Sequence, residues 1–110
     1  MLENSGYALR YLPLFYSDLE EKVLYIRDEL ENAAAAKDLI DDVEAAVMER
    51  LKAPEAFEIY HSKRNRHYPY YRIYLRNYTI YYVVISDEGP QKIMEVRRLL
   101  YNGQDRDRYL

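Results

Sequence analysis

The residues best suited to chemistry lie between Tyr68 and Tyr82, in the segment YPYYRIYLRNYTIYY, where seven of fifteen residues are tyrosine. Tyrosine favours β-strands and combines an aromatic ring with a polar hydroxyl. Because strand side chains alternate between faces, one face should carry Tyr71, Ile73 and Leu75. The other face should carry Tyr70, Arg72, Tyr74 and Arg76. A surface of rings and guanidinium groups can stack bases, bind phosphate or receive a partner peptide.

Other candidate residues are expected beside this face. Tyr81 and Thr79 should share it from the neighbouring strand. Alternation from Met94 and Val96 places Arg97 on it as well. The structural alternative is an ion pair to Glu95 or to an acidic residue of a helix. The preceding loop adds three cations that can bind nucleic acid or a partner: Lys63, Arg64 and Arg66.

Signatures of other chemistries are weak. His61 and His67 are the only histidines and the chain has no cysteine, so we expect no metal site, because two loop histidines lack further ligands at matching spacing. The sequence also contains no glycine-rich phosphate loop, nucleophile elbow or paired-carboxylate motif, and we expect no cofactor.

Charge is unevenly distributed along the 110 residues, although the net charge is only −3. Residues 1–60 hold six Lys/Arg and fourteen Asp/Glu, whereas residues 61–110 hold ten and five. The basic half can attract nucleic acid, but a dedicated nucleic-acid binder is usually basic overall. No stretch approaches the ~20 apolar residues that span a bilayer, and the first ten residues do not resemble a signal peptide. We therefore expect a cytoplasmic protein that does not enter membranes.

The pattern of residues predicts one α+β domain over residues 1–110. Strands are expected at 7–12, 70–76, 78–86 and 91–99. Apolar residues at helical spacing predict helices at 14–31 and from Ala33 to about Leu51, with Asn32 as N-cap and Pro54 ending the second. Residues 53–67 and 101–110 are expected to be loop and polar tail. The helical hairpin should cover one face of the sheet in a two-layer sandwich, leaving the other face open.

Several segments, in this order, resemble the RelE/ParE superfamily of bacterial toxins, which includes plasmid-stabilisation proteins. They are the opening YLPLFYSDLEEKVLYI, the alanine-rich second helix ending near LKAP, the strand pair YYRIYLRNYTIYYVV and the closing IMEVRRLLYNGQDRD. The resemblance implies the toxin of a type II toxin–antitoxin module, neutralised by a cognate antitoxin. It also implies one of two actions: ribosome-dependent cleavage of mRNA, as in RelE-like members, or poisoning of DNA gyrase, as in ParE-like members.

The resemblance implies a catalytic role for Arg72, with Tyr74, Tyr81 and Tyr101 positioning the RNA. The set is incomplete, because Tyr74, Thr79 and Tyr101 stand where nuclease relatives hold basic residues. Preorganised positive charge is needed to stabilise a phosphodiester transition state. Arg97, Arg106 and Arg108 can replace the missing charges only if the tail folds back over the open face. A non-toxic relative that only binds its partner is therefore the alternative, and a homodimer or toxin–antitoxin hetero-oligomer is possible.

Overall fold

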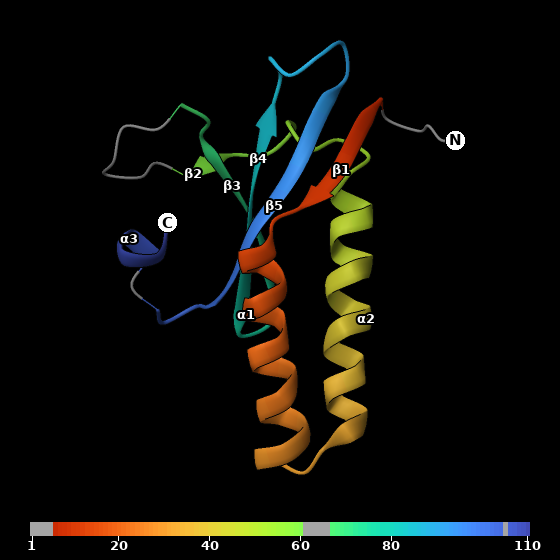
Figure 1. The fold of residues 1–110 in the computed structure, drawn as a ribbon, viewed down its shortest axis with the longest axis vertical. Coiled ribbons are helices and arrows are strands. Elements are labelled where there is room, and N and C mark those ends of the chain that lie inside the picture. Colours follow the sequence, from red (N-terminus) through yellow and green to blue (C-terminus); the bar gives the residue numbers. More distant parts are fainter. Residues whose placement is uncertain (1–5, 61–66, 105) are drawn as a thin grey trace.

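The computed structural model describes residues 6–60, 67–104 and 106–110, and it contains two long helices packed against a five-stranded sheet (Figure 1). The elements follow in the order β1 (Tyr7–Tyr11), α1 (Pro13–Leu24), a π-helix (Tyr25–Glu29), α2 (Ala33–Arg50), β2 (Ile59–Tyr60), β3 (Tyr70–Leu75), β4 (Tyr78–Ile85), β5 (Lys92–Tyr101) and α3 (Arg106–Tyr109). The predicted α+β architecture, with an N-terminal strand, a helical hairpin and an antiparallel meander, is confirmed.

The two long helices begin where the sequence predicts. Pro13 occupies the first turn of α1, where a missing N–H removes no helical hydrogen bond. At the start of α2, the backbone N–H of Ala35 donates to the side-chain oxygen of Asn32 at 3.0 Å. Local capping chemistry therefore fixes both starting points.

The end of the first helix differs from the predicted continuous helix to Glu31. The backbone N–H of Leu30 donates to the carbonyl of Tyr25, five residues earlier, at 3.1 Å, and closes the π-helix. Glu31 then has a φ of 51°, a left-handed conformation that glycine usually supplies at a helix end. The apolar period did not reveal this change, because a single wider turn alters the spacing of apolar residues very little.

The strands pair in the order β1-β5-β4-β3-β2, with β1 parallel to β5 and the other pairs antiparallel. The expectation that the N-terminal strand joins the sheet is confirmed. The expectation that residues 53–67 form only a loop is wrong, because Ile59 and Tyr60 pair with Tyr71 and Tyr70 of β3. Two residues are too few to produce a recognisable strand period.

Apolar side chains cover both faces of the sheet. The principal core lies between sheet and helices and includes Phe15, Leu39, Val47, Ile80 and Met94. A second cluster on the opposite face consists of Tyr70, Tyr81, Val83, Ile85 and Leu100, with Tyr60, Tyr68, Ile93 and Leu110 packed against it. The expectation of a fully open face is therefore wrong in part, because β2 and the C-terminal segment cover some of it.

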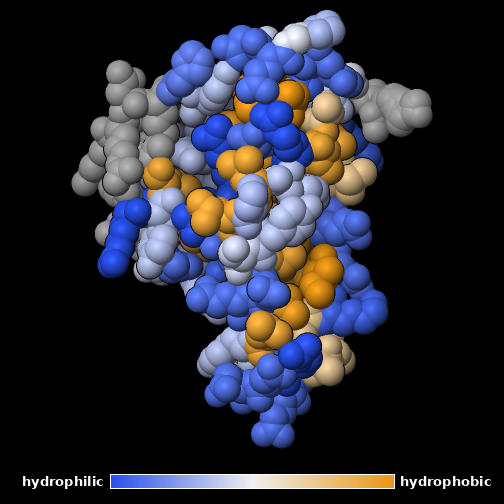
Figure 2. Space-filling view, viewed as in Figure 1, coloured by the Kyte–Doolittle hydropathy of each residue, from blue (hydrophilic) through white to orange (hydrophobic). Residues whose placement is uncertain are grey.

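The outer surface of the helical layer also carries apolar side chains. Figure 2 shows them over both helices, bordered by hydrophilic groups. Tyr16 is 56 % exposed, Leu24 39 % and Ile40 43 %. These side chains do not contribute to either core cluster.

A β-bulge in β5 determines which arginine side chains stay outside the core. Arg97 is the extra residue in the register between β4 and β5. Strict alternation from Val96 would direct Arg98 into the principal core. Because of the bulge, the side chain of Leu99 instead enters the principal core, where it is buried.

Beyond the end of β1, the carboxylate of Asp18 accepts a backbone hydrogen bond at the edge of β5. The last pair between β1 and β5 joins Tyr11 to Val96, and β5 continues beyond it. There the backbone N–H of Leu99 donates to the Asp18 carboxylate at 2.9 Å. The same carboxylate accepts hydrogen bonds from Nε and Nη2 of Arg98 at 2.8 and 2.9 Å. This charge-assisted bidentate pair ties α1 to the sheet.

The ammonium group of Lys22 is buried where α1 meets β5. The residue is 1 % exposed, and its Nζ lies 4.7 Å from the centre of the Tyr101 ring. The nearest polar contacts are the Asp18 carbonyl at 3.5 Å and the exposed Glu21 carboxylate at 3.9 Å. Burial lowers the pKa of Lys22, although the charges of Asp18 and Glu21 act in the opposite direction.

Replacing Asp18 by alanine should destabilise the fold by about 3 kcal/mol, because the part-buried Arg98 guanidinium loses its carboxylate and the buried N–H of Leu99 loses its acceptor. Urea denaturation measures this change in the free energy of unfolding. Asp41→Ala is the matched control, since its carboxylate pairs with Lys37 on the exposed surface, where ion pairs contribute little. Equal losses in the two variants would contradict the role given to Asp18.

Replacing Lys22 by methionine should stabilise the fold at pH 7 by about 1 kcal/mol, because no ammonium group then has to be buried. Between the lowered pKa of Lys22 and its ordinary value of 10.5, the unfolded chain binds more protons than the folded chain. The free energy of unfolding of the wild type should therefore rise with pH in this window. The gap between the free energies of unfolding of the wild type and of Lys22→Met should become smaller. Unfolding curves at pH 7, 8, 9 and 10 test this, and a constant difference would contradict it.

Candidate functional site

Four side chains form an aromatic and cationic surface on the sheet face opposite the helices. We call this surface the Tyr–Arg patch, and its members are Tyr60, Arg72, Tyr74 and Arg106. Arg72 and Tyr74 lie on β3 as alternation predicts, and Tyr74 is 63 % exposed. Tyr60 comes from β2 and Arg106 from α3.

Both arginines of the patch pack against the same ring. The Cζ atom of Arg72 lies 4.9 Å from the centre of the Tyr60 ring and 5.6 Å from that of Tyr74. The Cζ atom of Arg106 lies 5.8 Å from the centre of the Tyr60 ring. A guanidinium group near an aromatic ring at such distances is held by electrostatic attraction. Tyr60 therefore holds two positive charges close together.

The C-terminal segment delivers Arg106 to the patch. From the sequence, the return of the tail over the open face is only a condition for Arg106 to replace a missing charge, and the structure meets this condition (Figure 1). Nη1 of Arg98 donates to the carbonyl of Tyr109 at 2.8 Å, and Leu110 packs on the second apolar cluster. The return of the tail thus supplies one of the charges missing from β3 and β4.

Positive charge in the patch is not neutralised by any described side chain. Neither Arg72 nor Arg106 forms an ion pair with a carboxylate within residues 6–60, 67–104 and 106–110. By contrast, Arg98 pairs with the Asp18 carboxylate at 2.8 Å. The patch can therefore offer two guanidinium groups to an anionic or aromatic ligand.

Three predicted members of this surface are buried. Tyr70 is 5 % exposed, Tyr81 1 % and Thr79 3 %, so the expectation of a wet platform is wrong at these positions. The Thr79 hydroxyl donates to the side-chain oxygen of Asn102 at 2.6 Å. Burial raises the pKa of the Tyr81 hydroxyl, while the charges of Arg106 and Arg72 act in the opposite direction. Tyr81 therefore lies beneath the patch as a protonated hydroxyl.

Two other predicted residues lie away from the patch. Arg76 follows β3 in a turn with a φ of 55°, and its Nη1 lies 2.6 Å from the carboxylate of Asp42 on α2. The prediction that Arg76 shares a face with Arg72 is wrong, because strand alternation stops at the turn. Tyr101 stacks near Tyr78, a member of the principal core, with ring centres 5.3 Å apart. The structure therefore does not bring Tyr101 together with Arg72.

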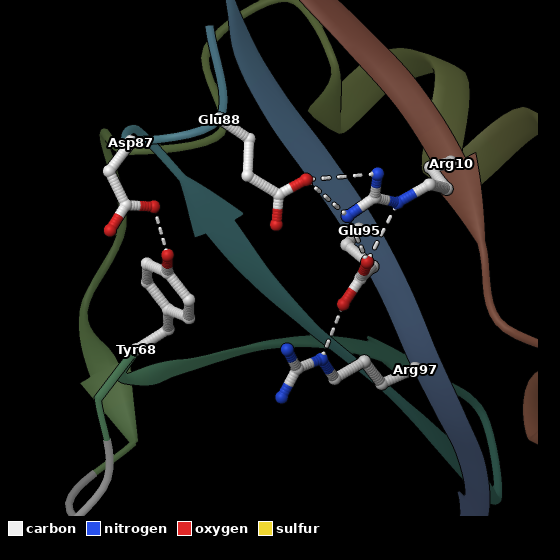
Figure 3. A network of polar contacts seen from close by, with 6 residues as sticks. All are labelled: Arg10, Tyr68, Asp87, Glu88, Glu95 and Arg97. Carbon is white, nitrogen blue, oxygen red and sulfur yellow. Dashed lines mark hydrogen bonds and ion pairs between the residues drawn. The ribbon is translucent and has the colours of Figure 1, made fainter.

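Arg97 lies on the predicted face but is neutralised there. Its Nε lies 2.7 Å from the carboxylate of Glu95, whose side chain is 5 % exposed (Figure 3). Arg10 of β1 approaches the same carboxylate at 2.6 Å and also contacts Glu88 at 3.4 Å. The alternative of an ion pair with Glu95 is thus confirmed, and this network mainly joins β1, β5 and the turn between β4 and β5.

A second polar cluster fixes the turn between β4 and β5 (Figure 3). The Tyr68 hydroxyl donates to the Asp87 carboxylate. Nε2 of His67, which Figure 3 does not draw, lies 3.4 Å from an oxygen of the same carboxylate. The hydrogen bond to Asp87 raises the pKa of Tyr68 to about 12. The cluster lines a pocket of about 340 Å³ with Glu55 and Ser86.

Sequence reasoning missed Tyr60 as a site residue. The available signal was the alternation of Phe57 and Ile59 with Glu58 and Tyr60 near the end of the presumed loop. This stretch was too short to interpret as a strand. Lys63, Arg64 and Arg66 lie outside the described residues. Across the part of the chain that the structure describes, no group of three or more His, Cys, Asp or Glu side chains could hold a metal ion. No described helix is both long and apolar enough to cross a membrane.

The comparisons with known proteins agree with this arrangement of strands and helices. No curated protein matches the chain. The family model for the ParE toxin of the type II toxin–antitoxin system parDE matches residues 9–106. Because this match spans nearly the whole chain, including the Tyr–Arg patch, the chain belongs to the ParE toxin family of the RelE/ParE superfamily.

Proposed function

We propose that this toxin arrests growth by binding DNA gyrase through the Tyr–Arg patch, without cutting RNA. The observation that carries the proposal is that the expected catalytic set does not assemble on an exposed surface. Tyr101 packs near Tyr78 on the helix side of the sheet, away from Arg72, and Tyr81, the cross-strand neighbour of Arg72, is buried. A ParE-like poison needs no nuclease site. Such a toxin would act in the cytoplasm.

The composition of the patch supports a protein-binding role. Interface residues that contribute most to binding are enriched in tyrosine and arginine. Tyr74 is largely exposed, and the two patch arginines have no described carboxylate partner. These rings and charges suit a protein surface with acidic and aromatic groups.

Membership of the toxin family implies an antitoxin partner. We further propose that the antitoxin covers the Tyr–Arg patch, since the same groups that bind the target must be hidden to neutralise the toxin. An acidic antitoxin segment would match the charges of Arg72 and Arg106.

Ribosome-dependent mRNA cleavage is the second candidate function. It is favoured by the approach of Arg72 and Arg106 to one ring, above the Tyr81 hydroxyl. Two convergent guanidinium groups can stabilise charge on a phosphodiester. In this version, Arg106 replaces one basic residue that nuclease relatives hold on the sheet.

The gyrase proposal predicts that Arg72→Ala and Tyr74→Ala abolish growth arrest, whereas Arg76→Ala remains toxic. Arg76 is the matched control because its guanidinium pairs with Asp42 on the helical side. Each patch substitution should weaken target binding roughly thirtyfold, the effect of losing about 2 kcal/mol at an interface. Colony counts after induced expression, with and without the antitoxin, measure toxicity.

Two assays separate the candidate targets. Purified wild-type protein should inhibit gyrase supercoiling, and primer extension on translated mRNA should show no new ends. New mRNA ends that disappear in Arg72→Ala would overturn the gyrase proposal in favour of cleavage. Normal growth with every variant and the wild type would instead identify a non-toxic family member.

A further inference from the structure

The outer surface of the helical layer contains a groove that neither core cluster explains. It encloses about 490 Å³ between α1 and α2. The lining residues relevant here are Tyr16, Glu20, Val23, Leu24, Arg27 and Ile40. Figure 2 shows hydrophobic side chains in this region. Tyr16, Leu24 and Ile40 are exposed, whereas Val23 is partly buried against the principal core. Exposed apolar groups gathered in a groove with a charged border are typical of an interaction surface.

The charged residues of the groove form a symmetric pattern along α1 and the π-helix that continues it. Glu20 and Arg27 both line it, on either side of the apolar pair Val23 and Leu24. Glu20 forms no ion pair with another described side chain. Arg27 pairs with its neighbour Asp28 at 2.8 Å, with both side chains more than half exposed. An exposed pair between adjacent residues contributes little, so Arg27 can change partner at low cost.

We propose that a second copy of this chain occupies the groove and forms a two-fold symmetric homodimer through α1. Two antiparallel α1 helices related by an axis between Val23 and Leu24 place Glu20 of one copy opposite Arg27 of the other. Glu20 then lies roughly 5 Å from the axis along α1, given a rise of ~1.5 Å per residue, and Arg27 lies on the other side of the axis in the π-helix. The symmetry creates two identical ion pairs, as a self-complementary interface requires.

The apolar residues fit the same arrangement. Leu24 lies at the axis, where it meets its own copy and the partner's Val23. Tyr16 extends toward the end of the partner's hairpin, where Leu30 is also 56 % exposed. An antiparallel pair of helices with apolar residues at the centre and opposite charges at the border is a stable packing mode.

The charge pattern favours a second copy over an unrelated partner. An unlike partner does not require the acid and the base of this groove to lie equally far from its apolar centre. A two-fold axis does require it, because each charge must find its opposite on an identical surface. Glu20 and Arg27 meet this condition on one helical stripe.

Charge exchange tests the dimer. Sedimentation of the purified chain over a range of concentrations should show a monomer–dimer equilibrium. Glu20→Arg and Arg27→Glu should each raise the dimer Kd about tenfold or more, because each places like charges opposite one another twice. The double variant Glu20→Arg/Arg27→Glu should restore the wild-type Kd. Monomeric wild-type protein at all concentrations, or no restoration in the double variant, would overturn the proposal.

Two further variants distinguish this interface from a general effect of charge. Leu24→Asp should abolish the dimer while leaving the far-ultraviolet circular dichroism unchanged, since the side chain is partly exposed in the monomer. The exchange Glu49→Lys/Lys52→Glu alters an exposed pair outside the groove and should not change the Kd. A dimer that persists in Leu24→Asp or weakens in the Glu49/Lys52 variant would show that α1 is not the interface.

Discussion

The ion pair between Asp18 and Arg98 connects α1, the edge of β5 and the C-terminal segment. β1 is shorter than β5, so the edge of β5 beyond Val96 needs another hydrogen-bond acceptor. Asp18 supplies it and simultaneously fixes the guanidinium of Arg98. That guanidinium also holds the carbonyl of Tyr109, and hence the C-terminal segment with Arg106. A helix, a sheet edge and one half of the Tyr–Arg patch thus depend on a single buried carboxylate.

The need to pair buried charges also determines which arginines remain available for binding. Buried or half-buried charges must be paired, because an unpaired charge in a low-dielectric environment costs several kcal/mol. Glu95 therefore forms ion pairs with Arg10 and Arg97, and Asp18 forms one with Arg98. Arg72 and Arg106 are held by aromatic rings instead, which attract a cation without neutralising it. Two positive charges of the basic half therefore remain without a described carboxylate partner at the Tyr–Arg patch.

Sequence patterns predicted the fold well, since alternation, apolar period and capping residues act locally. They placed Arg72, Tyr74 and Arg97 on the correct face for the same reason. They failed where a residue's position depends on distant parts of the chain. Tyr70 and Tyr81 are buried because the C-terminal segment returns over them, and Arg76 leaves the patch because the strand ends one residue earlier. Tyr60 belongs to a strand of two residues, which only its pairing with β3 defines.

The position of the helices relative to the patch has a consequence for the assembled toxin. α1 and α2 cover one face of the sheet, whereas the Tyr–Arg patch lies on the opposite face. A dimer formed through the outer surface of α1 would leave both patches uncovered and directed away from the shared axis. Such a dimer presents two copies of the same binding surface, and a target that is itself two-fold symmetric can engage both. Bivalent engagement raises the effective affinity without any new contact, provided that the spacing of the two patches matches the target.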